Sequence, residues 1–297
     1  MSNSASNKRI VHIDGDIIVY SVGFAANDDP VENALHSVKI LIKSITDATE
    51  ADEYVVHLTG KGNFRNELAT IQGYKANRKD AAKPVHYDAI RNYLINHWGA
   101  FVTYGQEADD TIGIEMTRPS DHTLICASLD KDLEMIVGEH YNWRKKEHYH
   151  ISPDDADKFF IIQLLTGDST DNIPGLKRIT GKVASKSIKD YCIEPDNFTS
   201  CIERVYETYR EHAPDLDVCK TLSEIGNLLW IRRYGYKTWE DYAAESTPNE
   251  SREHLDGESV LGIHQIGTEV EEQSIPSEVS GDERCEETLQ EEGQTEV

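Results

Sequence analysis

Acidic residues follow short apolar segments repeatedly along the first 171 residues of this chain. Residues 10–20 (IVHIDGDIIVY) predict a buried strand that ends near Asp14, and two later apolar segments are followed by further acids. Carboxylates at the ends of neighbouring strands repel one another strongly unless cations neutralise them. The pattern therefore predicts a hard-metal site built entirely from oxygen ligands. The eight acids form four clusters, namely Asp14; Glu107, Asp109 and Asp110; Asp130 and Asp132; Asp168 and Asp171.

Helical and strand-like segments alternate in the same part of the chain. Apolar residues in 31–45 recur at helical spacing, which separates this helix from the strand at 54–60. Such alternation predicts an α/β fold with a mostly parallel sheet covered by helices on both faces. Ligands of these sheets bind at the carboxyl ends of the strands, where Asp14, Glu107 and Asp130 would lie. Further strands are expected at 100–105 and 123–130, and further helices at 85–98, from 107 and at 154–168.

The charge of the chain is concentrated near its end. The net charge of the 297 residues is −24, and residues 245–297 alone carry 16 acidic and 2 basic residues. Low hydrophobicity and high charge predict that this tail is disordered. We also expect residues 1–8 to be disordered. The interpretations of the tail are partner docking, competition with nucleic acid for a basic groove, and simple solubilisation. Between the termini we expect a catalytic α/β domain at 9–166 and a mostly helical subdomain at 167–244.

The cysteines and the N-terminus predict a reduced, cytoplasmic environment. The cysteines are scattered without CxxC spacing, which argues against a zinc site or a disulfide framework. Residues 1–8 lack the apolar stretch of a signal peptide, and no segment approaches the length of a membrane span. We therefore expect a soluble protein without membrane contact.

Each acidic cluster taken alone has an ordinary explanation. Glu107, Asp109 and Asp110 fit an acidic first turn of a helix, which the helix dipole tolerates well. Asp130 and Asp132 form a DxD after a strand, and residues two apart in an extended segment face the same side. The coincidence of four such clusters favours the metal site over these separate explanations.

The most specific segment is GDSTDNIPGLKRITGKVASKSI, residues 167–188. Asp168 and Asp171 are followed by glycines and basic residues, with no acid between 172 and 189. Glycine turns let backbone N–H groups approach phosphates, and basic side chains add charge. The segment resembles a helix–hairpin–helix element in its helix–three-turn–helix form, which grips a duplex backbone without reading sequence. The predicted DNA contacts of this segment are Gly175, Lys177, Arg178, Gly181, Lys182 and Lys186, and Lys189 is a further basic residue next to it.

A second basic segment is GYKANRKDAAKPVHY, residues 73–87. Tyr74 offers a stacking ring, and Lys79 and Lys83 add positive charge, which together suit a nucleic-acid strand approaching metal ions. Lys75 and Arg78 are the candidates to stabilise charge that develops on a scissile phosphate. The alternative for this segment alone is a surface loop with a few lysines.

Together and in this order, the motifs IDGD, YKANRK, EADD, SLDKDLEMI and GDSTDNIPGL resemble the 5′-nuclease superfamily. This superfamily includes flap endonucleases, the 5′-nuclease domains of bacterial DNA polymerases and bacteriophage 5′–3′ exonucleases, and the likeness is greatest to the phage enzymes. It covers roughly residues 9–240. It implies a metal-dependent 5′–3′ exodeoxyribonuclease or structure-specific flap endonuclease that acts on DNA with a free 5′ end or 5′ flap. The implied products are 5′-phosphorylated, RNA–DNA hybrids are a further expected substrate, and the compartment of a phage protein would be the host cytoplasm.

The resemblance also implies roles for individual residues. Two Mg²⁺ ions, replaceable by Mn²⁺, are expected, with K⁺ at the hairpin turn as a further ion. Tyr74, Lys75 and Arg78 would act on the scissile phosphate at the base of an arch at about 73–98. The acidic tail lies outside the resemblance, and docking of a replication partner is one of its interpretations. One metal would lie on the side of Asp14, Glu107, Asp109 and Asp110, and the second on the side of Asp130, Asp132, Asp168 and Asp171.

Three positions depart from the family pattern. Many relatives carry an Asp after the second strand, where this chain has Thr59 and Gly60. The usual Ile-Gly of the hairpin is Ile179-Thr180 here, with Gly181 one place later. Asp16 is an additional acid close to Asp14, for which we expect a supporting or structural role.

Two other functions remain open from the sequence. IDGD and GDSTD also resemble motifs of haloacid dehalogenase-type phosphatases, with Asp14 as nucleophile and Asp16 as acid or base, but this leaves the basic segments without a role. A catalytically silent DNA-binding relative is the other alternative. A silent relative would usually have lost several carboxylates, whereas eight are present here.

Overall fold

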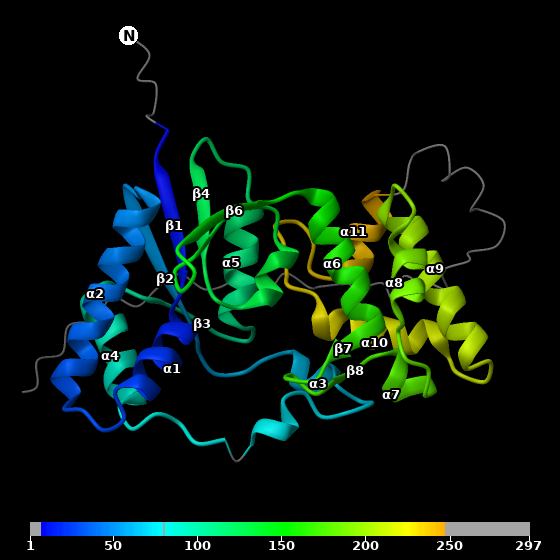
Figure 1. The fold of residues 1–297 in the computed structure, drawn as a ribbon, viewed down its shortest axis with the longest axis horizontal. Coiled ribbons are helices and arrows are strands. Elements are labelled where there is room, and N and C mark those ends of the chain that lie inside the picture. The colour runs from blue at the N-terminus through cyan, green and yellow to red at the C-terminus, as the bar shows by residue number, and fades with distance from the viewer. Residues whose placement is uncertain (1–6, 80, 247–297) are drawn as a thin grey trace, which may run out of the picture. The chain divides into compact units, whose positions relative to one another are not determined.

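The computed structural model describes residues 7–79 and 81–246, and within them a central sheet of six strands is covered by helices (Figure 1). The strand order is β3-β2-β1-β4-β5-β6; the first five strands are parallel, and β6 runs antiparallel to β5. The predicted α/β fold with a mostly parallel sheet is therefore confirmed. The strands are β1 (Arg9–Asp14), β2 (Glu53–Thr59), β3 (Phe101–Thr103), β4 (Thr123–Ala127), β5 (Gly138–Asn142) and β6 (Glu147–Ile151).

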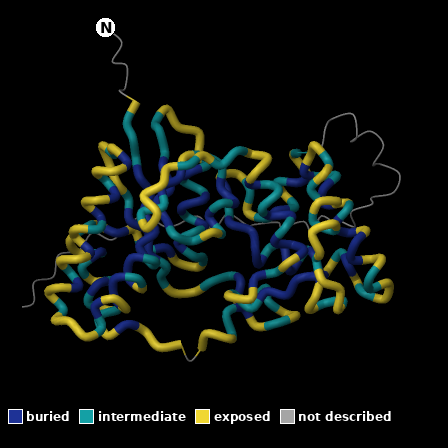
Figure 2. Tube along the Cα trace, in the orientation of Figure 1, coloured by how far each residue is buried: buried dark blue, intermediate teal, exposed yellow. Residues whose placement is uncertain are grey.

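The central strands of the sheet carry buried side chains on both faces, and Figure 2 shows buried chain in the interior of the molecule. Val11 and Ile13 of β1 pack in a core with α1 (Gly15–Ala25), α2 (Val31–Thr49) and α4 (Tyr87–Trp98). Cys126 of β4 faces the opposite side, in the core that includes α5 (Ala108–Thr117). The alternation follows from the two-residue period of a strand.

The chain turns from strand to helix immediately after Asp14, so β1 ends where the sequence predicted, and residues 15–20 of the apolar segment belong to α1. The Asp14 side chain caps α1 by accepting a hydrogen bond from the Ile17 amide at 3.1 Å. Ile18 and Val19 are fully buried against the sheet. β-Branched residues favour strands by propensity, but tertiary packing overrides that preference here.

A second apolar core lies in the C-terminal helices. Phe160, Tyr209, Trp230 and Trp239 are almost fully buried in it, and it continues to Ile112 of α5. The region is largely helical, as predicted. Its elements are α6 (Pro153–Thr166), the short hairpin β7 (Gly167–Asp168) and β8 (Ile173–Pro174), α7 (Leu176–Thr180), α8 (Lys186–Ile193), α9 (Phe198–His212), α10 (Val218–Leu229) and α11 (Trp239–Ser246).

The connection between β2 and α4 reaches from the sheet to these helices and back (Figure 1). It contains α3 (Arg65–Leu68) and the 3₁₀ helix η1 (Ala76–Arg78). α4 packs against α1 and α2, with Ile90 and Leu94 in the core. Of the arch expected at 73–98, the part outside this packed helix is therefore residues 73–86.

The predicted disordered tail lies almost wholly outside the described residues, as do residues 1–6 of the predicted disordered N-terminus. Among the described helices, none combines the length and the hydropathy that crossing a membrane requires.

Candidate active site

A cleft of about 620 Å³ opens at the carboxyl ends of β1 and β4. The strand order reverses direction at this point, because β2 and β3 lie on one side of β1 and β4 lies on the other. Crevices of this kind are the usual ligand sites of open α/β sheets. Acidic and basic side chains share the walls, including Asp14, Asp16, Glu107, Asp109, Asp130, Lys75, Arg78, Lys79 and Lys83.

Asp14 is fixed at the end of β1. Its carboxylate accepts hydrogen bonds from the Ile17 amide at 3.1 Å and the Ser128 hydroxyl at 2.7 Å, and the residue is 2% exposed. Burial raises the pKa of Asp14 to about 7, and the carboxylates of Asp16 and Asp130 contribute to the rise. The two hydrogen bonds therefore fix the position of the Asp14 side chain, but they only partly stabilise its negative charge.

Glu107 and Asp109 reach the same cleft from the start of α5. Glu107 is the N-cap of the helix, in a capping box with Asp110. Burial raises the pKa of Asp109 well above its usual range, and repulsion from Asp14, Asp130 and Glu107 adds to the effect. Asp109 is thus repelled by three other carboxylates, and all the donor atoms that these four acids offer are oxygens. Oxygen donors of this kind are the ligands that divalent hard cations prefer.

Asp110 is not brought into the cleft, although the sequence predicted it as a metal ligand. It is fully buried and accepts two hydrogen bonds from Arg65 at 2.6 and 2.8 Å and one from the Arg232 amide at 3.1 Å. Burial opposes its ionisation, but the Arg65 guanidinium outweighs this and lowers the pKa of Asp110. Arg65 also donates to the Leu228 and Trp230 carbonyls, at 3.0 and 2.6 Å. Asp110 therefore ties α5 to the C-terminal helices.

Asp132 and Asp168 form a second acidic group around Lys131. The Lys131 ammonium contacts them at 2.8 and 3.0 Å, and Gln163 donates to Asp132 at 2.6 Å. Asp168 also accepts from the Thr170 amide at 2.6 Å, which shapes the loop between β7 and β8. Burial raises the pKa of Asp132 to about 6, whereas Lys131 helps to lower the pKa of Asp168 against the effect of burial.

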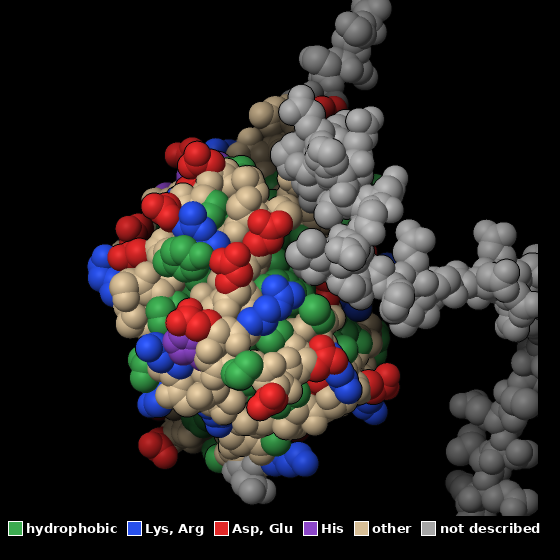
Figure 3. All heavy atoms as spheres, turned by 90° about the vertical axis from the view of Figure 1, so that its right-hand side faces the viewer, with side chains coloured by type: hydrophobic (Ala, Val, Ile, Leu, Met, Phe, Trp, Pro, Cys, Tyr) green, Lys and Arg blue, Asp and Glu red, His purple; other side chains and the backbone are tan. Residues whose placement is uncertain are grey.

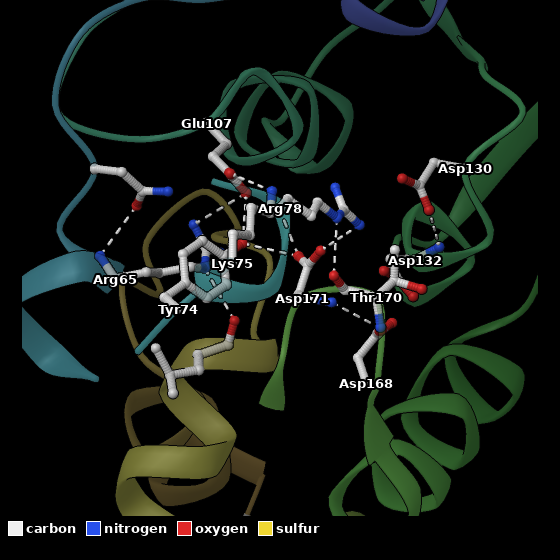
Figure 4. A network of polar contacts seen from close by, with 12 residues as sticks. Arg65, Tyr74, Lys75, Arg78, Glu107, Asp130, Asp132, Asp168, Thr170 and Asp171 are labelled. Atoms are coloured by element: carbon white, nitrogen blue, oxygen red, sulfur yellow. Dashed lines mark hydrogen bonds and ion pairs between the residues drawn. The ribbon is translucent and has the colours of Figure 1, made fainter. Parts of the chain in front are cut away.

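Tyr74 and Lys75 connect the two acidic groups (Figure 4). The Tyr74 hydroxyl lies 2.9 Å from both Glu107 and Asp171, and the Lys75 ammonium lies 2.5 Å from Glu107 and 3.4 Å from Asp171. Arg78 contacts Asp171 at 2.8 Å. As they lie here, no three His, Cys, Asp or Glu side chains of residues 7–79 and 81–246 are grouped closely enough to hold a metal ion. Cationic side chains pair with the outer carboxylates instead, while Asp14 and Asp109 face the cleft.

The predicted DNA contacts differ in exposure. Lys177, Arg178, Lys182 and Lys186 are exposed on α7, α8 and the turn between them. Gly181 ends α7 with φ of +79°, which supplies the glycine turn one residue later than the family pattern. Lys189 is half-buried on α8, and Lys79 and Lys83 are exposed beside the cleft.

Gly175 differs from the other predicted contacts because it is buried. A Cβ there would lie 2.2 Å from the Thr166 carbonyl carbon and 2.3 Å from the Gly167 nitrogen, so glycine is required for packing. Figure 3 views the side of the C-terminal helices and shows acidic and basic side chains interspersed over it. The basic residues within 177–186 are therefore confined to α7, α8 and the turn between them and are not part of a larger basic surface on this face.

Several residues of the site were missed by sequence reasoning. Lys131 lies between two of the predicted acids and could have been noticed for that reason. The neighbouring sequence gives no signal for Arg65, Arg91 and Gln163. Each of these side chains contacts a carboxylate that is at least 31 residues away in the chain.

Comparison with known proteins gives distant relatives. No family model matches the chain. It is 25% identical to DNA polymerase I of Thermus caldophilus over 243 residues and 27% identical to DNA polymerase I of Bacillus caldotenax over 254 residues. Each match covers 73% of this chain and 28% of the polymerase, so the chain spans little more than a quarter of their length. A 5′–3′ exonuclease of Buchnera aphidicola subsp. Schizaphis graminum is 25% identical over 209 residues, covering 62% of this chain and 71% of that protein.

Among solved structures, the T5 D15 protein co-crystallised with metal ions aligns with 17% identity and a TM-score of 0.45, covering 75% of this chain and 96% of that one. The bacteriophage T5 D15 flap endonuclease in a complex with DNA and metal ions gives 18% identity and a TM-score of 0.43, covering 80% and 97%. The sequence relatives confirm the resemblance to 5′-nucleases that the motifs predicted.

Proposed function

We propose that this homologue of the 5′–3′ exonucleases is a divalent-metal-dependent DNA nuclease that hydrolyses phosphodiester bonds near 5′ ends and releases 5′-phosphorylated products. One observation carries the proposal. Asp14 and Asp109 line a cleft that Lys75, Arg78 and Lys79 also line. A cleft that combines carboxylates for metal ions with cations for phosphate suits phosphodiester hydrolysis.

The acidic residues divide into two candidate metal positions. Asp14, Glu107, Asp109 and Asp130 would hold one ion, and Asp132, Asp168 and Asp171 the other; Asp110 is excluded by its pairing with Arg65. Mg²⁺ is the proposed ion, with Mn²⁺ as a substitute, because the donors are carboxylate oxygens. When bound, such ions lower the pKa of nearby water and neutralise charge on the phosphate.

The chain's own cations would bind and orient the substrate. Lys75 and Arg78 pair with Glu107 and Asp171 here, and a phosphate entering the cleft would compete for their N–H donors. The Tyr74 hydroxyl lies within hydrogen-bond distance of both Glu107 and Asp171 and can donate its one proton to either carboxylate. Lys79 and Lys83, both exposed at the mouth, would attract the charged backbone in a salt-dependent manner.

The turn between α7 and α8 would hold the duplex. Its support is the exposure of Lys177, Arg178 and Lys182 around the left-handed Gly181. A 5′ single strand would then pass along residues 73–86. An RNA strand in an RNA–DNA hybrid, and K⁺ at this turn, remain predictions.

The test uses a DNA duplex with a 5′ overhang, labelled at either the 5′ or the 3′ end, with Mg²⁺, Mn²⁺ or EDTA. Early release of short 5′-labelled products that depends on the metal is expected. Asp109→Asn should reduce cleavage by about 100-fold by removing one acid of the cleft, while the exposed Asp121→Asn serves as the matched control.

Two outcomes would overturn the proposal. One is an intact substrate under every metal condition, which would favour a silent DNA-binding protein. The other is hydrolysis of p-nitrophenyl phosphate without DNA cleavage, which would favour the phosphatase alternative. A parallel arm with an RNA strand in the 5′ position reports on the hybrid substrate.

A further inference from the structure

We propose that Asp16 is a positioning residue of the catalytic centre: it accepts a hydrogen bond from water held at the metals, at the corner of the cleft where β2 cannot supply a carboxylate. The proposal deepens the proposed function and rests on it. It assigns a role to an acid outside the eight that the sequence singled out.

Asp16 faces the same cleft as the acids of the candidate centre. It lies in the first turn of α1, two residues after Asp14, and lines the cleft with Glu107 and Asp109. The Asp16 side chain is 28% exposed, so part of it is open to the solvent of the cleft.

The Asp16 carboxylate is held on both oxygens. The Thr59 amide donates to Oδ2 at 2.9 Å, and the Arg91 guanidinium donates to Oδ1 at 3.2 Å. Arg91 also donates to the Thr59 carbonyl at 2.8 Å, which closes a ring of three residues from α1, β2 and α4. A carboxylate can accept about four hydrogen bonds, so each oxygen keeps capacity for a further donor.

The pairing with Arg91 determines the kind of role. The Arg91 side chain is 16% exposed and neutralises much of the Asp16 charge. A carboxylate whose charge is already compensated is a weaker direct ligand for a divalent ion than Asp14 or Asp109. It remains a good acceptor for a water O–H, and outer groups of this kind orient the ligands of metal sites.

The end of β2 has no room for a carboxylate of its own. A Cβ at Gly60 would lie 2.4 Å from the Thr103 carbonyl oxygen and 3.0 Å from the Tyr104 ring. The Thr59 hydroxyl is engaged by the Ala108 amide at 2.9 Å, at the start of α5. At this corner the acid comes from α1: Asp16 is held there by the Thr59 amide.

The test compares Mn²⁺ binding without DNA and steady-state cleavage for Asp16→Asn, with Asp88→Asn as the control. Asn keeps the size and an acceptor for Thr59 but loses the charge, and Asp88 is an exposed acid in the first turn of α4. We expect Asp16→Asn to weaken Mn²⁺ binding or lower kcat by about 10- to 100-fold with KM unchanged. Asp16→Glu, which keeps the charge, should retain more of both than Asp16→Asn.

Mn²⁺ affinity and kcat that equal those of the wild type in a folded Asp16→Asn protein would overturn the proposal and leave the nuclease function standing. Equal losses in Asp16→Asn and Asp16→Glu would also overturn it, because they would show that the carboxylate charge at this position is not what the centre uses. A wild-type protein that binds Mn²⁺ but cleaves no DNA would instead refute the proposed function, and the binding comparison would still decide the role of Asp16.

Discussion

Asp109 and Asp110 are adjacent in the chain, yet their carboxylates lie in opposite environments. At about 100° per residue, neighbouring side chains in a first helical turn point to different sides. Asp109 faces the cleft and Asp110 faces Arg65. The sequence predicted that acids gather here, but it could not separate the two roles because Arg65 lies 45 residues away in an irregular connection.

Substitution should separate these two aspartates. Asp110→Ala leaves the buried Arg65 unpaired and should lower the free energy of unfolding by about 3–5 kcal/mol. Asp109→Asn removes a repelled charge, so it should leave stability unchanged or raised in EDTA while reducing cleavage by about 100-fold. Urea denaturation in EDTA measures the free energy of unfolding of both variants, and the DNA cleavage assay measures their activity. A stable but inactive Asp110→Ala protein would contradict the assignment and return Asp110 to the metal ligands.

The connection from β2 to α4 is positioned by elements distant in sequence. Glu224 of α10, which is 6% exposed, accepts hydrogen bonds from the Thr70 and Ile71 amides at 2.7 Å each and from the Thr70 hydroxyl. The Lys75 amide donates to the Asp171 carbonyl at 2.9 Å. The composition of 73–87 predicted a basic segment, but which cations meet which carboxylates depends on these long-range anchors.

Glu224→Ala tests this anchoring at the level of the element. Removing the acceptor leaves two amides of the connection without their partner, so stability should fall by about 1–3 kcal/mol. Hydrogen exchange at residues 70–75 should accelerate more than exchange in α9, and kcat should fall because Tyr74 and Lys75 lose their fixed place. The exposed Glu203→Ala of α9 is the matched control. Unchanged exchange at 70–75 would show that the segment is held by other contacts.

At the scale of the molecule, the first four strands were predictable from the sequence, and their order in the sheet was not. Periodicity located β1 to β4 because each combines an apolar run with a polar end. β5 and β6 were missed, since sequences such as EHYHI mix polar and aromatic residues at a half-exposed sheet edge. The buried contact between His12 and His57, with ring nitrogens 3.0 Å apart, also depends on the pairing of β1 with β2.

This histidine pair predicts how stability depends on pH. Burial lowers the pKa of His12, and it lowers the pKa of His57 to about 3. Below pH 6.5 the unfolded chain therefore binds more protons than the folded protein, so stability is lost as the pH falls from about 6.5 toward 3. The slope is about 1.4 kcal/mol per pH unit for each histidine.

The measurement is urea denaturation of the wild type and of the His12→Gln, His57→Gln double variant between pH 7 and pH 5. The stability advantage of the wild type should shrink as the pH falls, while the carboxylates, Asp14 included, contribute equally to both proteins. Parallel curves for the two proteins would contradict the prediction.

The crowding at Gly60 has a consequence for how this site can evolve. A single base change converts a glycine codon into one for aspartate or glutamate, so an acid at the end of β2 is within one mutational step. The Thr103 carbonyl, 2.4 Å from where the Cβ would stand, makes that step costly until the edge of β3 has moved. Proteins that share this backbone are therefore expected to keep glycine at position 60 and to keep the acid at position 16 of α1, while neighbouring positions change more freely.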